Sequence, residues 1–264
     1  MKTKKTLSTL IASLLMAGAA QASTIVYQDT FGDGDLAVNA GTGGGAINRT
    51  ISNGVWSEAA GEASFTASNT RFSRNAILYA SNTFQSSGGF QLDVDYTIGS
   101  LNDSGGNDLS FGIVSSETDF SSYGDAGDSS DNPFASITSV YSLGVNITGA
   151  SRGLNFTDSS TVTSLDVSGD NAQFVANAST AVSITIGTGG AWSYSIGGVE
   201  EATGTIVGGF DLTKSYRFVA YGQDDQGPKT LQSVTLTAIP EPSAYALLAG
   251  LTGLALVVAR RRQS

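Results

Sequence analysis

The sequence predicts an all-β protein, an antiparallel β-sandwich flanked by one apolar helix at each end of the chain. Three observations predict this fold class. Glycine is frequent, at 33 of 264 residues, whereas proline occurs 4 times and charged residues make up only 14%. β-branched and aromatic residues, which strands prefer, are spread throughout residues 23–238. Apolar and polar residues alternate there with a period of two, which indicates strands with one buried face.

In chain order, the first strands are expected at residues 25–29, 64–67, 76–80, 90–97, 109–113 and 140–147. Segment 90–97 shows the alternation over its whole length. Its apolar residues share one face: Phe90, Leu92, Val94 and Tyr96. Its polar residues share the other: Gln91, Asp93, Asp95 and Thr97. This strand is therefore expected to bury one face and to expose the other to water.

A hairpin is expected next, from strands at 182–186 and 191–196 joined by turn residues 187–190, which include three glycines. Trp192 falls in register with Tyr194 and Ile196, so it is predicted to lie in the core. The last strands are expected at 215–221 and 233–238. About a dozen short strands with no internal boundary predict one sandwich domain over residues 23–238.

Two stretches of this region are VSITIGTGGAWSYSIGG (182–198) and FDLTKSYRFVAYGQD (210–224). Together they resemble the paired back-sheet strands of concanavalin A-like or laminin G-like sandwiches. A jelly-roll sandwich would give similar alternation, and so would an immunoglobulin-like one, although that domain is usually nearer about 100 residues. The resemblance implies the concanavalin A-like fold, with the jelly roll kept open as the alternative.

The N-terminal residues 1–22 have the three parts of a signal peptide. An apolar stretch, 7–20, follows a basic start made of Lys2, Lys4 and Lys5. Ala20 and Ala22 then form the A-x-A pattern of a cleavage site before Ser23. We therefore expect signal peptidase to cut here and the chain to be exported across the inner membrane.

The C-terminal residues 239–264 combine three features in a fixed order. Pro240, Glu241 and Pro242 come first, and the two prolines favour an extended backbone. Residues 244–259 carry no charge and would form a helix of roughly 24 Å, marginal for a bilayer span. Arg260, Arg261 and Arg262 follow and would keep the C-terminus in the cytoplasm.

This three-part tail resembles a PEP-CTERM sorting signal, found on exported proteins of certain Gram-negative bacteria. The resemblance implies a transient membrane anchor and cleavage near Pro-Glu-Pro by an exosortase-type protease. Delivery to the cell surface or the extracellular matrix would follow. The alternative is a plain tail anchor with a proline hinge.

Composition excludes several functions of the body. Six of the 13 basic residues lie in the two terminal segments. Residues 23–238 therefore contain 7 basic and 22 acidic residues, a net charge of −15. Such a body would repel nucleic acid and attract cations. The chain has no cysteine and no histidine, so disulfides, thiolate metal sites and histidine-based catalysis are excluded.

Acidic turns are the candidate calcium sites, because calcium prefers carboxylate, amide and carbonyl oxygens. The sequence DTFGDGD concentrates Asp29, Asp33 and Asp35 directly after the first strand and is the favoured candidate. Two further loops carry the remaining clustered aspartates: Asp103, Asp108, Asp125, Asp128 and Asp131. The alternative is that aspartate simply stabilises these turns by bonding to nearby backbone groups.

Exposed aromatic side chains could stack on sugar rings, and four were considered: Trp56, Tyr123, Trp192 and Tyr221. Tyr123 lies in an acidic glycine-rich loop and is the best surface candidate. Most aromatics at alternating positions of a sandwich fill its core.

No catalytic constellation is evident. Glu200 and Glu201 are adjacent and would point to opposite faces of a strand, while Asp93 and Asp95 share a face that is expected to be solvated. We therefore expect a non-catalytic surface or matrix protein associated with extracellular polysaccharide. The alternative is a secreted carbohydrate-active enzyme, a glycoside hydrolase or lyase, on the same fold.

Overall fold

A computed structural model describes residues 23–39, 41–52, 54–67, 75–99, 107–120, 132–134, 141–148, 151–158, 161–168, 177–223 and 228–241. The predicted signal peptide, the predicted apolar helix at 244–259 and the arginine cluster lie outside these residues. In the described part no helix is long and apolar enough to cross a bilayer.

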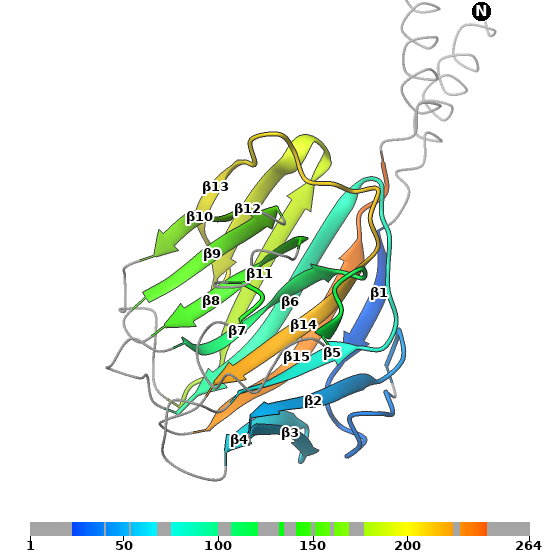
Figure 1. The fold of residues 1–264 in the computed structure, drawn as a ribbon, viewed down its shortest axis with the longest axis vertical. Coiled ribbons are helices and arrows are strands. Elements are labelled where there is room, and N and C mark those ends of the chain that lie inside the picture. Colours follow the sequence, from blue (N-terminus) through cyan, green and yellow to red (C-terminus); the bar gives the residue numbers. More distant parts are fainter. Residues whose placement is uncertain are drawn as a thin grey trace, which may run out of the picture.

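The chain forms two antiparallel sheets (Figure 1). Along its main path, the eight-stranded sheet has the order β13 (Val199–Thr205), β12 (Ala191–Ile196), β11 (Thr180–Gly187), β6 (Gly89–Ile98), β15 (Lys229–Ala238), β4 (Glu62–Ala67) and β3 (Gly54–Ala59). Its eighth strand, β1 (Thr24–Asp29), pairs with the second half of β15, while β4 pairs with the first three residues of β15.

The seven-stranded sheet has the order β10 (Val162–Ser168), β9 (Ser151–Asp158), β8 (Tyr141–Thr148), β7 (Asn107–Ser115), β14 (Tyr216–Gln223), β5 (Asn75–Ala80) and β2 (Ala46–Ser52). Neighbours in both sheets are often distant in sequence: β6 pairs with β11 and β15, and β14 pairs with β7 and β5. These pairings bring distant segments of the chain together within each sheet.

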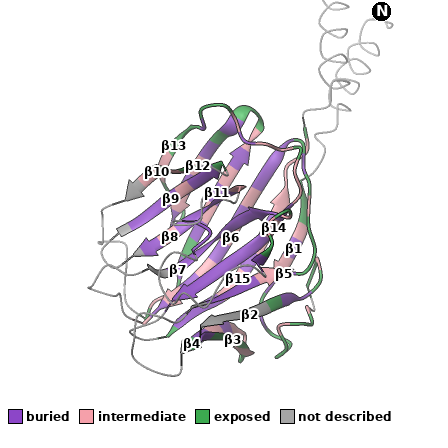
Figure 2. Cartoon of the chain, viewed as in Figure 1, coloured by how far each residue is buried: buried purple, intermediate pink, exposed green. Residues whose placement is uncertain are grey.

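The main core fills the space between the sheets, and buried positions run along the strands (Figure 2). In β6 the burial alternates as predicted, with Phe90, Leu92, Val94, Tyr96 and Ile98 inside and the residues between them half exposed. Trp192 is 8% exposed and belongs to this core, as predicted.

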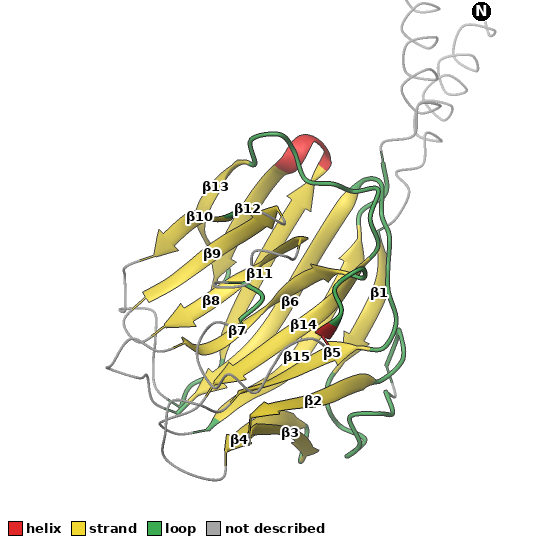
Figure 3. Cartoon of the chain, in the orientation of Figure 1, coloured by secondary structure: helices red, strands yellow, loops and turns green. Residues whose placement is uncertain are grey.

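All ten predicted strands are present, and the hairpin of β11 and β12 turns through the short 3-10 segment η4 (Thr188–Gly190). Five further strands, β2, β3, β9, β10 and β13, form where none was predicted. The described residues contain no α-helix, and the η4 segment drawn red in Figure 3 is a 3-10 turn. The predicted antiparallel β-sandwich is therefore confirmed for the described body.

A second, smaller core covers the outer face of the seven-stranded sheet. It contains Ile77, Val114, Phe120, Phe134, Val219 and Tyr221. Phe120 and Phe134 come from segments that follow β7 and precede β8 rather than from the sheet. They bury outward-facing side chains of β7 and β14, which are therefore covered on both faces.

Candidate functional site: the polar face of the eight-stranded sheet

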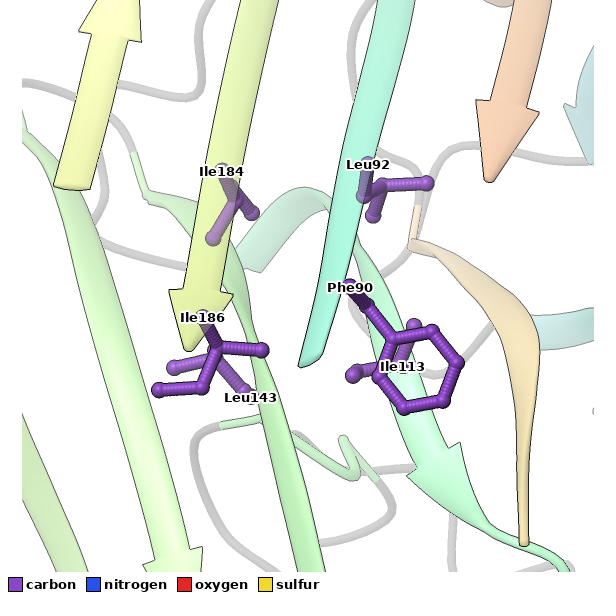
Figure 4. Close-up of a pocket in the computed structure, with 6 residues that line it drawn as sticks. All are labelled: Phe90, Leu92, Ile113, Leu143, Ile184 and Ile186. Carbon is purple, nitrogen blue, oxygen red and sulfur yellow. The ribbon is translucent and has the colours of Figure 1, made fainter. Parts of the chain in front are cut away.

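A small apolar cavity lies between the two sheets. This cavity, of about 10 Å³, is lined by side chains from both sheets (Figure 4): Phe90, Leu92, Ile113, Leu143, Ile184 and Ile186. A single water needs roughly 10–15 Å³ and polar partners, which these side chains do not provide. This cavity is therefore too small and too apolar to hold a polar ligand.

The outer face of the eight-stranded sheet presents polar side chains in rows across its central strands. On β6, Asp93 pairs with Ser183 of β11 on one side and with Thr235 of β15 on the other. Ser183 pairs in turn with Ser195 of β12, which pairs with Glu200 of β13. One row of hydroxyl and carboxylate groups thus crosses five strands.

A parallel row lies two residues along β6. Gln91 pairs with Thr185 and with Thr237, and Thr185 pairs with Ser193 of β12. Ser193 pairs in turn with Thr203 of β13. Because side chains two residues apart on a strand share a face, the two rows form one surface, which we call the polar face.

Two carboxylates on the polar face are held by neighbouring side chains. The Gln91 amide Nε2 donates to both carboxylate oxygens of Asp93, at 3.2 and 3.0 Å. The Ser233 hydroxyl donates to Asp95 Oδ2 at 2.8 Å. An ionised carboxylate has about four acceptor sites, so both groups retain acceptor capacity toward solvent.

An open depression of about 230 Å³ lies on the polar face. Its polar lining consists of Asp93, Asp95, Ser183, Ser195 and Ser233, and Gly198 borders it. Hydroxyls donate and accept hydrogen bonds, whereas carboxylates accept them from ligand hydroxyls. This chemistry suits a polyhydroxylated ligand, such as a sugar.

The aromatic side chains considered for sugar stacking do not reach this surface. Trp56 is 1% exposed, packs against Phe65 and donates from Nε1 to the Ala76 carbonyl oxygen at 3.1 Å. Tyr221 is fully buried. The suggestion that these two could stack on sugars is therefore wrong, because both fill the core. Tyr123 lies outside the described residues.

The three aspartates predicted to bind calcium are occupied by their own turns. Asp29 is 2% exposed and accepts hydrogen bonds from the Phe31 backbone N–H at 2.8 Å and the Tyr27 hydroxyl at 3.3 Å. Burial raises the pKa of the Asp29 carboxyl. Asp33 Oδ1 accepts from the Asp35 N–H, and Asp35 Oδ1 from the Ala37 N–H.

These aspartates do not converge on a common site. Asp29, Asp33 and Asn39 line a depression of about 240 Å³, but Asp35 does not. Within the described ranges, no group of three or more acidic side chains is placed to hold a metal ion. The turn interpretation thus accounts for the backbone N–H groups that donate to these three residues, while Asp33 also interacts with the Glu58 side chain of β3. Asp103, Asp125, Asp128, Asp131 and the side chain of Asp108 lie outside the described part.

Glu58 also contacts this acidic turn, a contact that no local sequence pattern predicts. Its Oε1 accepts from the Gly34 N–H at 2.7 Å, which ties β3 to the turn after β1. Burial raises the pKa of the Glu58 carboxyl, and the neighbouring Asp33 adds to the rise. The carboxyl group therefore fastens the turn to the eight-stranded sheet.

The residues of the polar face were missed as a site by sequence reasoning. The alternation in 90–97 correctly predicted that Asp93 and Asp95 point outward. Their partners Ser183 and Ser233 could not be identified, because the pairing of β6 with β11 and β15 depends on long-range register.

Of the predicted processing motif, the structure describes Pro240 and Glu241. Both follow directly after β15, beside the loop that precedes β6. Ser23, the residue expected after signal-peptide cleavage, directly precedes β1.

No protein-family model and no curated protein sequence matches the chain. Solved structures similar to it include lectin II from Ulex europaeus, with a TM-score of 0.57 and 12% identity over 83% of this chain and 99% of that one. Peanut lectin with a 9-residue peptide gives 0.56 and 12%, over 82% and 97% of the two chains. The exoplasmic/lumenal domain of VIP36, in its Ca²⁺/Man3GlcNAc-bound form, gives 0.52 and 10%, over 72% and 82%.

At these identities the likeness concerns the fold. The expectation of a concanavalin A-like sandwich is confirmed to that extent: the described body is a two-sheet antiparallel sandwich like that of the legume-type lectins.

Proposed function

We propose that the body is a non-catalytic carbohydrate-binding domain that engages polysaccharide through the polar face. The observation that carries this proposal is the pair of cross-strand rows around the 230 Å³ depression. Hydroxyl and carboxylate groups at the spacing of a sheet can hydrogen-bond successive sugar hydroxyls without an enclosed pocket. An extended polymer suits such an open face.

The similar structures support this proposal. Among them, VIP36 is bound to Man3GlcNAc and a lectin from Bauhinia forficata is in complex with GalNAc. These ligands belong to those proteins, but they show that this type of sandwich serves as a scaffold for sugar binding.

Export and sorting form the second part of the proposal. Signal peptidase would cut before Ser23, and the tail would hold the chain in the inner membrane with its C-terminus in the cytoplasm. An exosortase-type protease would then act near Pro-Glu-Pro and free the body for the cell surface or the extracellular matrix. The order of the motif, the uncharged run and the arginines supports this route.

Calcium is a further component that we propose for the body without assigning it to Asp29, Asp33 and Asp35. The VIP36 domain is calcium-bound in two of the similar structures, and the body is strongly acidic. If calcium binds, the melting temperature of the purified body will be higher in calcium than in EDTA. Equal melting temperatures would remove calcium from the proposal.

A secreted carbohydrate-active enzyme remains the second candidate, and one observation favours it. Asp93 and Asp95 point outward from the same strand, and two residues along a strand span roughly 7 Å, within the separation used by inverting glycosidases. Their depression is open rather than a cleft. Release of reducing ends from polysaccharide by the wild type, but not by D93N or D95N, would establish the enzyme.

A glycan-array screen of residues 23–241 tests the binding proposal. These residues contain the complete described core, so the screen uses the body as a unit. We expect retained binding to one class of glycan. Loss of binding in S183R, but not in S57R at the exposed Ser57 of β3, would assign the binding to the polar face. Absence of binding to any polysaccharide would contradict the proposal.

A further inference from the structure

Both ends of the body leave the fold at one corner. β1 begins at Thr24 and β15 ends at Ala238, and these two residues are cross-strand partners. β1 and β15 lie side by side in Figure 1, with the start of one next to the end of the other. The segments that precede and follow the body are therefore connected to the same end of the eight-stranded sheet.

Residue 239 remains attached to the body beyond the end of β15. The Ile239 N–H donates to the Gly89 carbonyl oxygen at 2.9 Å. The Ser86 hydroxyl donates to the Ile239 carbonyl oxygen at 2.6 Å. Both backbone hydrogen-bonding groups of Ile239 are thus engaged, one by the first residue of β6 and the other by the loop that precedes it.

The next two residues lie against Gly88. A Cβ built on Gly88 would collide with the backbone of Ile239 and Pro240, and would lie 2.6 Å from the Glu241 nitrogen. Gly88 is buried, whereas Glu241 is exposed. Only glycine allows such close backbone approach at this position. We call the contact of Ser86, Gly88 and Gly89 with residues 239–241 the exit clamp.

The exit clamp leaves almost no free linker before the uncharged run. Only Pro242 and Ser243 separate Glu241 from the start of the run at Ala244. An extended chain advances at most about 3.6 Å per residue, so Ala244 begins no more than about 11 Å from Glu241. A chain anchored through 244–259 would hold this end of the sandwich at the membrane surface.

We propose that the exit clamp sets where the tail is cut: processing occurs at the Glu241–Pro242 bond or beyond it, and the mature body keeps Ile239, Pro240 and Glu241. This inference rests on the proposed sorting. A protease must surround an extended backbone to hydrolyse it, and the clamp holds the backbone of Ile239 by two hydrogen bonds and packs Gly88 against Pro240. The described contacts of the clamp end at the Glu241 nitrogen, and the Glu241–Pro242 bond is the first bond beyond them in the chain.

The reaction itself is ordinary peptide hydrolysis by the processing protease. The C–N bond breaks, and one water supplies a hydroxyl to the new C-terminal carboxyl group and a proton to the leaving nitrogen. If the bond is Glu241–Pro242, the leaving group is the proline nitrogen at the head of the discarded tail. No redox partner is needed.

Hydrogen exchange of the full chain in detergent tests the clamp without requiring the natural protease. We expect the Ile239 amide to be protected in the wild type. It should exchange about tenfold faster in S86A, which loses the hydrogen bond to the Ile239 carbonyl oxygen, and in G88A, whose added Cβ would push the segment that carries this amide away from the body. G187A is the matched control: Gly187 pairs with Gly89, but an added Cβ there meets nothing closer than 3.8 Å.

Broad-specificity proteolysis of the same samples locates the accessible bond. The trimmed wild type and G187A should end at residue 241 or later, whereas G88A should also be cut between 238 and 241. An unprotected Ile239 amide in the wild type, or wild-type cleavage before Glu241, would overturn the clamp.

The C-terminal residue of the processed protein from the producing cell then tests the cutting position. We expect Glu241 or a later residue, and a mature chain ending at 238–240 would overturn the inference. If no processed form exists, the sorting proposal fails, and with it the assigned cutting position. The exchange and proteolysis experiments would still show whether the clamp itself is present.

Discussion

Asp93 of β6 and Ser183 of β11 are direct cross-strand partners, although they lie far apart in the sequence. Asp93 is also held by the Gln91 amide, which donates to both of its oxygens. The carboxylate is therefore oriented by Gln91 next to the position of Ser183 on the neighbouring strand. This combination makes the polar face suitable for binding sugar hydroxyls.

Replacing Gln91 with alanine should weaken glycan binding, because Asp93 would lose the side chain that orients it. Loss of one such hydrogen bond corresponds to about a 3- to 10-fold lower affinity. Isothermal titration with the glycan found on the array would measure it. Q85A is the control, since the Gln85 amide donates to the Thr213 carbonyl oxygen outside the polar face. Equal affinities of Q91A and wild type would contradict this role.

Asp29 should make stability depend on pH. Burial raises its pKa above the ordinary value of 3.8, so the folded state retains the proton to higher pH than the unfolded chain does. Stability from this group therefore falls as pH rises from 3.8 through the raised pKa, by about 1.4 kcal/mol for each unit of the rise.

The variant D29N would remove this dependence while keeping an acceptor for the Phe31 N–H. Denaturant unfolding should show that D29N gains stability relative to wild type as pH rises from about 3.8 to 7. D35N, on an exposed turn of the same kind, is the control. A constant difference between D29N and wild type across this range would refute the prediction.

Gly144 of β8 should not tolerate a side chain. An added Cβ would lie 2.5 Å from both the Phe111 carbonyl oxygen and the Phe134 ring, in the region where Phe134 covers the seven-stranded sheet. Overpacking of this kind costs about 1–3 kcal/mol. Chemical denaturation of G144A should show this loss, whereas G187A, which has room, should remain close to wild type. Unchanged stability of G144A would mean that Phe134 is not packed there.

Replacing Pro240 and Pro242 with alanine should reduce processing and surface delivery, because the extended backbone that a protease would read is no longer enforced. Fractionation of the producing cells, with the mass of each form, would show the unprocessed chain accumulating in the membrane. R217A serves as a control, since Arg217 lies in the body, where its guanidinium donates to the Ser116 carbonyl oxygen. Unchanged processing of the double variant would remove the motif from the sorting proposal.

Local alternation was sufficient to predict the strands that pack one apolar face into the main core. β6 and the β11–β12 hairpin are examples, because their side chains carry the burial pattern in their own sequence. β13 was missed because it is a sheet-edge strand whose residues are all half or fully exposed, including Glu200. Such a strand forms through pairing with β12 rather than through a pattern of its own.

The candidate site depended on information that no local pattern contains. Nothing in the sequence near Asp93 specifies Ser183, Ser195 or Thr235 as neighbours, since register is set by the whole sheet. The burial of Trp56 could not be predicted from the local sequence pattern either. Its packing partner Phe65 lies on β4, and its hydrogen-bond acceptor Ala76 lies on β5 of the other sheet.

Binding of the isolated body to extracellular polysaccharide, compared between wild type, S183R and S57R, tests the central claim most directly. The account predicts that wild type and S57R bind alike and that S183R, with a bulky side chain in the depression, loses binding. Equal binding of all three proteins would place the site elsewhere, and no binding by the wild type would contradict carbohydrate binding by this body.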